Sequence, residues 1–132
     1  MNADLVYVLD SEGLSQGALG ATPMGARLKD AARSGIRVVT SAMTMIEAEH
    51  ERINKAAWSW TLSRIVVEPV TQEVAEEALV LLRDAGLHGH KYAIDAALVA
   101  VALRQRGRVV VYTSDVDDIE RISGGRLRVA RL

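Results

Sequence analysis

The stretch AIDAALVAVAL, residues 93–103, holds ten apolar residues and a single charged one, Asp95. Such a run is typical of a buried helix. Burying a carboxylate is costly unless a cation or hydrogen-bond donors replace its hydration. We therefore expect Asp95 either to form a buried salt bridge with an arginine or to belong to a functional site.

On both sides of this stretch, short apolar runs alternate with segments of helical spacing, which predicts an α/β sandwich with a mostly parallel sheet. We expect strands at residues 5–9, 36–39, 65–68, 108–112 and 127–130, and helices at residues 24–33, 42–49, 54–63, 72–85, 93–103 and 115–122. Thr71 and Gly86 should bound the 72–85 helix, and Thr40 or Ser41 should cap the 42–49 helix. Residues 11–25 are rich in glycine and predict a weak helix or a mobile loop, and residues 87–91 predict a loop.

The composition fits one domain over residues 1–132, since 49% of the residues are hydrophobic and the length leaves no room for a second core. There is no cysteine, which excludes disulfides and thiolate-bound metals. The first residues do not resemble a signal peptide, and the 93–103 run is shorter than the roughly 20 residues that span a bilayer. We expect a soluble cytoplasmic protein with no membrane contact.

The net charge of −1 does not indicate a nucleic-acid binder, although the thirteen arginines, against three lysines, carry groups suited to phosphate.

Two further acids follow predicted strands: Asp10 comes after LVYVL and Asp115 after VVVYTS. In a parallel sheet the ligand crevice lies at the carboxyl ends of the strands, so both can meet Asp95 at one edge. Phosphodiester hydrolysis needs a water molecule of lowered pKa and a stabilised leaving oxygen, and Mg²⁺ or Mn²⁺ bound by carboxylates supplies both.

Each acid also has another interpretation. Taken alone, Asp10 could be a phosphoacceptor or a helix cap, and an acid of the TSDVDD segment could cap the helix that follows. A glutamate could complete this site. Of Glu47, Glu49 and Glu51, the apolar MTMIEA segment weakly favours Glu47 for that role.

Four motifs in this order resemble the PIN domain: Asp10 after the first strand, Ser41 followed by Glu47, Asp95 in IDAALVAVAL, and TSDVDDI. More narrowly, the whole chain resembles the small PIN ribonucleases of the VapC toxin type. The resemblance implies a PIN-like three-layer sandwich and a Mg²⁺- or Mn²⁺-dependent endoribonuclease acting on tRNA, rRNA or mRNA. It also implies a toxin held by a cognate antitoxin, and we expect a homodimer.

Position by position, the resemblance implies an acidic quartet that binds metal and activates water: Asp10, Glu47, Asp95 and Asp115. Thr113 or Ser114 would hold the quartet by hydrogen bonds, and Asp117 or Asp118 would be an accessory acid. The chain departs from the family directly after Asp10, where Ser11-Glu12-Gly13 stands in place of apolar residues or alanine.

Other residues have two interpretations each. Lys91 and Arg104 bracket the Asp95 helix and are candidates for RNA phosphate contacts, although a solvated helix end explains them equally well. His88 and His90 are expected to be exposed loop residues rather than metal ligands. Trp58 and Trp60 could stack on bases, but on a helix they point about 200° apart, so at least one should belong to the core or a partner surface.

Two other function classes stay open. A catalytically silent PIN-like module would bind RNA or protein without cutting it. A phosphoaspartyl enzyme or receiver domain would use Asp10 as acceptor, but it needs a lysine after a strand, and none of the three lysines follows one.

Overall fold

The computed structural model describes residues 4–20, 22–50 and 52–132, which form five strands and seven helices. The strands make one sheet in the order β3-β2-β1-β4-β5, and every pairing is parallel. The strands are β1 (Leu5–Leu9), β2 (Arg37–Ser41), β3 (Val66–Glu68), β4 (Arg108–Thr113) and β5 (Arg128–Arg131). The helices are α1 (Ser11–Leu19), α2 (Pro23–Ser34), α3 (Ala42–Ala48), α4 (Lys55–Ser63), α5 (Gln72–Ala85), α6 (Gly89–Leu103) and α7 (Val116–Ser123). The predicted α/β architecture is confirmed.

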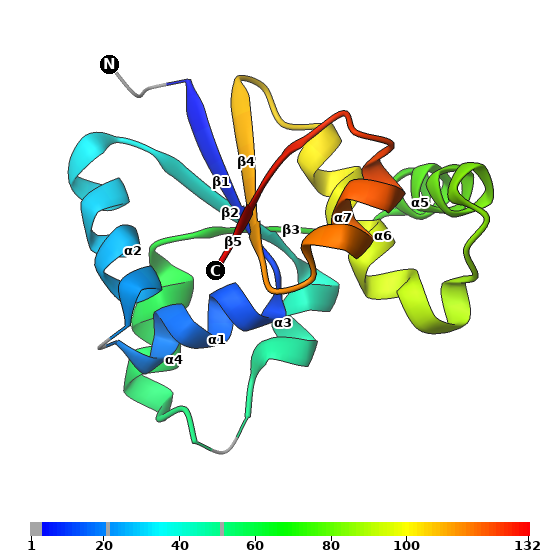
Figure 1. Ribbon diagram of the computed structural model, residues 1–132. Helices are drawn as coiled ribbons and strands as arrows, with labels where there is room; N and C mark the ends of the chain where they lie inside the picture. Colours follow the sequence, from blue (N-terminus) through cyan, green and yellow to red (C-terminus); the bar gives the residue numbers. More distant parts are fainter. Residues whose placement is uncertain (1–3, 21, 51) are drawn as a thin grey trace.

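Helices cover both faces of the sheet, which explains why the central strand β1, LVYVL, is apolar throughout rather than alternating (Figure 1). On one face, α5, α6 and α7 pack against Val8, Val39 and Val111, which are paired across β2, β1 and β4. On the other face, Leu28 of α2 packs in one cluster with Leu9 and Tyr112. The apolar run of α6 is the centre of the first core, since Ala96 to Ala102 are all buried.

Because the sheet is parallel, the segments after β1, β2 and β4 start from one edge. Asp10 is the N-cap of α1, Ser41 is the N-cap of α3, and Asp115 stands at the N-cap position of α7. This edge is where the fold gathers the predicted site.

Residues 11–25 were predicted as a weak helix or a mobile loop, and over Ser11–Leu19 the structure shows the helix. Asp10 caps α1, and Gly17 allows close packing, since a Cβ there would lie 2.6 Å from Leu28 Cδ1. The loop predicted at residues 87–91 is wrong from Gly89 onward, where α6 begins, and the His88 carbonyl accepts from the Lys91 and Tyr92 amides.

Within the described ranges, no helix is long and apolar enough to cross a membrane.

Gly107, in the turn before β4, is the glycine least able to carry a side chain. Its φ is +103°, and an added Cβ would lie 2.1 Å from the Asp4 carbonyl oxygen. Gly107→Ala should therefore lower the free energy of unfolding by roughly 3 kcal/mol or more, because backbone strain and steric overlap add. Gly35→Ala is the matched control: its φ is +69° with nothing within 4 Å of the added Cβ. It should cost only about 1 to 2 kcal/mol of strain. Equal losses in urea unfolding of the two variants would contradict this account.

Candidate metal centre

Five carboxylates line one cavity of about 460 Å³ at the carboxyl edge of the sheet. They come from four parts of the chain: the end of β1, α3, α6, and the start of α7. The acids are Asp10, Glu47, Asp95, Asp115 and Asp118, and Ser11, Lys91 and Tyr92 complete the lining. The fold thus brings the predicted quartet together with one of the two predicted accessory acids, while Asp117 does not line the cavity.

Asp10 is the most firmly held of these acids and is only 5% exposed. Its Oδ1 accepts from the Gly13 amide at 2.8 Å, and its Oδ2 accepts from the Thr113 hydroxyl at 2.6 Å and the Ser114 amide at 3.1 Å. Burial raises the pKa of Asp10 above its ordinary value, and the three donors oppose that rise. Asp10 is therefore a helix cap and a cavity acid at once.

Thr113, the last residue of β4, links the end of its strand to Asp10, which follows β1. Its fully buried hydroxyl donates to Asp10 and accepts from the Asp115 amide at 2.9 Å. Asp115 makes no side-chain cap bond to α7, so its exposed carboxylate is free to face the cavity. The predicted holding role of Thr113 and Ser114 corresponds to these hydrogen bonds on Asp10.

Asp95 is half-buried, lying one residue before the fully buried part of α6. No ion pair within the described residues reaches it, so the buried salt bridge considered from the sequence is not observed. Burial, followed by the negative charges of Asp115, Asp10, Glu47 and Asp118, raises the pKa of Asp95 to about 6. The five carboxylates of the cavity thus carry more negative charge than its one lining cation, Lys91, can balance.

The donor set fits a hard divalent cation by its chemistry, because Mg²⁺ and Mn²⁺ prefer carboxylate oxygens. The cluster is not preformed, however: among the described residues, no three His, Cys, Asp or Glu side chains stand close enough to hold one ion. Glu47 and Asp115 have exposed side chains that can rotate. An ion would have to draw the carboxylates inward.

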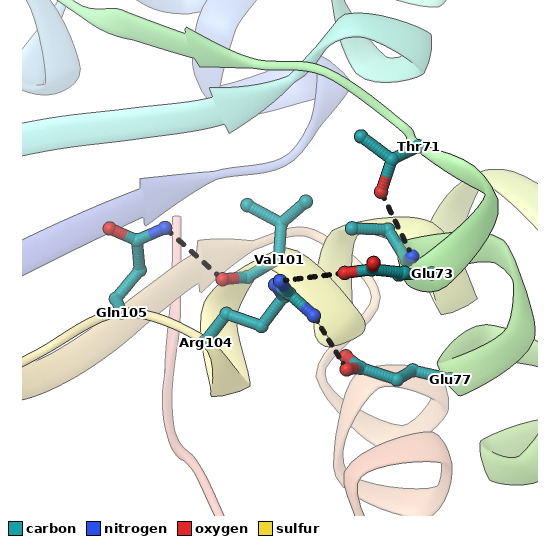
Figure 2. A network of polar contacts seen from close by, with 7 residues as sticks. Thr71, Glu73, Glu77, Val101, Arg104 and Gln105 are labelled. Atoms are coloured by element: carbon teal, nitrogen blue, oxygen red, sulfur yellow. Dashed lines mark hydrogen bonds and ion pairs between the residues drawn. The ribbon is translucent and has the colours of Figure 1, made fainter.

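A second acidic hollow, of about 510 Å³, lies beside α5 and is lined in part by Glu73, Glu76 and Glu77. Figure 2 shows Arg104 between two of these glutamates, with nitrogen–oxygen distances of 2.6 Å to Glu77 and 3.7 Å to Glu73. Arg104 thus offsets part of the negative charge beside this hollow, whereas no ion pair among the described residues involves an acid of the Asp95 cavity. Arg104 stands at the opposite end of α6 from Lys91 and does not line the Asp95 cavity.

The histidines and tryptophans lie away from this cavity. His88 and His90 are exposed, but His88 is the N-cap residue of α6 and His90 lies in its first turn rather than in a loop. Trp58 is half-buried, and Trp60 is 37% exposed with the Arg64 guanidinium 5.3 Å from its ring centre. Neither tryptophan belongs to the buried core.

Sequence reasoning missed two lining residues, Ser11 and Tyr92. Tyr92 lies three residues before Asp95, and so on the same face of α6. That spacing would have identified it, had the helix been predicted to begin before residue 93. Ser11 follows Asp10 directly and was noted only as a departure from the family pattern.

Models of known protein families give no match to this chain, and no curated protein matches its sequence. Solved structures do share its fold. A chain of VapBC2 from Rickettsia felis, bound to a DNA fragment from the promoter, aligns with a TM-score of 0.65 and 14% identity, covering 96% of this chain and 98% of that one. A chain of FitAB bound to the IR36 DNA fragment aligns with a TM-score of 0.63 and 20% identity, covering 95% and 94%. The protein therefore has the PIN-like fold, a parallel sheet flanked by helices, over nearly its whole described length.

Proposed function

We propose that this protein is a metal-dependent endoribonuclease, the toxin of a toxin–antitoxin pair. The observation that supports the proposal most strongly is the cavity of five carboxylates, in which mutual repulsion and burial raise the pKa of Asp95 to about 6. Holding acids together without a cation destabilises the folded protein, so such a cluster is expected at a functional site.

In this proposal, Asp10, Glu47, Asp95 and Asp115 hold Mg²⁺ or Mn²⁺, and Asp118 is the accessory acid. A bound divalent ion lowers the pKa of a water molecule and neutralises charge on the reacting phosphate. The chain itself keeps Asp10 aimed at the cavity through three hydrogen bonds, and it keeps Asp95 on a helix that the core holds rigidly.

Lys91 supplies the positive charge that the chain itself adds to this cavity. It lies one turn before Asp95, lines the same cavity, and takes part in none of the ion pairs among the described residues. We assign it an RNA phosphate contact. Arg104, by contrast, is occupied by Glu77 and Glu73.

The partner proposal rests on the likeness to chains of VapBC2 and FitAB, which are toxin–antitoxin complexes. We propose that a cognate antitoxin binds this protein and that the protein forms a homodimer in the cytoplasm. Expression should arrest growth, and co-expression of an antitoxin encoded by a small neighbouring gene should relieve the arrest. Light scattering of the purified protein measures the dimer.

Purified protein should cut RNA with Mg²⁺ or Mn²⁺ and stop when EDTA is added. Metal should also raise the melting temperature, because an ion present at 100 times its Kd that binds only the folded state adds about 2.7 kcal/mol to the free energy of unfolding.

Lys91→Met should raise KM for RNA more than it lowers kcat, because the variant loses a contact to an RNA phosphate and no metal ligand. Cutting that continues in EDTA would overturn the metal mechanism, whereas metal and RNA binding without turnover on any RNA would favour the silent PIN-like module.

A further inference from the structure

Glu47 depends more than the other cavity acids on the placement of a short helix. Its side chain is exposed, whereas Asp10 is fixed by three hydrogen bonds. It lies on α3, a helix of seven residues of which only Thr44 and Ala48 are buried. So little buried surface does not by itself fix the position of a helix. Where Glu47 points therefore depends on what anchors α3 at its two ends.

Side-chain hydroxyls make both anchors. At the start, Ser41 Oγ accepts from the Thr44 amide at 3.1 Å and lies 3.0 Å from Thr44 Oγ1. At the end, Ser15 Oγ donates to the Ala48 carbonyl at 2.6 Å. Ser15 is 7% exposed and Ala48 is 2% exposed, so this bond is shielded from water. The carbonyls of a last helical turn have no partner within the helix, and Ser15 supplies one.

The hydroxyl of Ser15 comes from α1, the same helix that Asp10 caps. The bond to Ala48 therefore fixes the end of α3 relative to α1. Through these two helices it sets how Glu47 stands relative to Asp10 across the cavity that both line.

We propose that Ser15 is a positioning residue for Glu47: its hydrogen bond to the Ala48 carbonyl holds the end of α3 so that the Glu47 carboxylate faces the acidic cavity. This inference rests on the proposed function, because it takes Glu47 to be a metal ligand. Ser15 itself does not line the cavity, so it would act on a bound ion only through Glu47.

The test is the affinity for Mn²⁺, measured by electron paramagnetic resonance on the intact chain. Ser15→Ala should weaken Mn²⁺ binding about tenfold, the lower end of what is lost when a group supporting a metal ligand is removed. Ser63→Ala is the matched control, because Ser63 Oγ donates to the Trp60 carbonyl at the same 2.6 Å, on an exposed part of α4. It should leave the affinity unchanged. If Ser15→Ala does not fold, Ser15→Cys keeps the volume while donating only weakly, with the same expected loss.

A double-mutant cycle separates positioning of Glu47 from general loosening of the protein. In a Glu47→Gln background, Ser15→Ala should change Mn²⁺ affinity less than about twofold, because the ligand it positions is already gone. The same loss in both backgrounds, or no loss in the wild type, would overturn the proposal. If Glu47→Gln binds no Mn²⁺, the comparison of Ser15→Ala with Ser63→Ala decides alone. Wild-type protein that binds no Mn²⁺ would instead overturn the proposed function itself.

Discussion

Asp95→Asn is expected to abolish metal-dependent RNA cutting, with a loss on the order of a thousandfold or more in kcat/KM, or about 4 kcal/mol of transition-state stabilisation. The amide keeps the shape of the side chain but removes the negative charge and one oxygen ligand. Because Asp95 lies on a helix whose next seven residues are buried, the substitution should leave the backbone around the cavity in place. Single-turnover cleavage of a labelled RNA measures the loss.

The same variant should melt at a higher temperature than the wild type when metal is absent. The pKa of Asp95 is raised from 3.8 to about 6, chiefly by burial, so between these pH values the folded state binds more protons than the unfolded state. Stability therefore falls as pH rises through that window, and the ionised carboxylate destabilises the metal-free fold above it. The full shift corresponds to about 3 kcal/mol, and solvent screening at this half-buried site reduces the penalty that asparagine removes at pH 7 to about 2 kcal/mol. Below about pH 3, where Asp95 is protonated in both states, the difference should vanish.

Asp84→Asn is the control for both measurements, since Asp84 is an exposed acid on α5 outside the cavity. It should change neither cleavage nor metal-free stability. Asp95→Asn protein that still cuts RNA with metal would contradict the assigned role. Protein that neither cuts RNA nor gains stability in EDTA would contradict the charge argument.

Thr113→Val is expected to lower cleavage about a hundredfold at pH 7, and it also lowers the free energy of unfolding by about 2 to 4 kcal/mol. Valine fills the same volume but can neither donate to Asp10 nor accept from the Asp115 amide. Both groups then lose a buried partner. The hydrogen bond from Thr113 is the largest influence that lowers the pKa of Asp10, so its removal raises that pKa further.

The activity lost in Thr113→Val should partly return at higher pH, because the ionised form of Asp10 is the one that can bind a cation. Thr61→Val provides the comparison. Thr61 is as fully buried as Thr113, but it donates only to the Ala57 carbonyl of its own helix, at 2.9 Å. It should cost less stability and leave the pH profile of cleavage unchanged. A profile for Thr113→Val that keeps the wild-type shape would argue against the link to Asp10.

Features that depend on neighbours in sequence could be predicted. Helix α5 has the predicted bounds, residues 72–85. Its ends could be predicted because the Thr71 hydroxyl and the left-handed Gly86 act on neighbouring residues of the chain. The acids after β1 and β4 were predicted at one edge because a parallel sheet leaves them no other place.

Features that depend on distant partners could not be predicted. Arg104, a candidate for RNA contact, has its ion-pair partners on α5, 27 or more positions earlier in the chain, and no local pattern indicates them. The bond from Ser15 to Ala48 spans 33 positions and leaves no local signal. Nor could the sequence show whether the carboxylates converge on one point, since this depends on side-chain rotation rather than on spacing.

The central pairing of β1 with β4 has a consequence for how activity and folding are linked. It brings Asp10 to Thr113, 103 positions away, and the remaining acids arrive on α3, α6 and α7. No contiguous fragment of the chain holds more than part of this constellation. In the proposed nuclease, unfolding of any one segment that carries a cavity acid should therefore abolish cleavage, even while the rest of the domain stays folded.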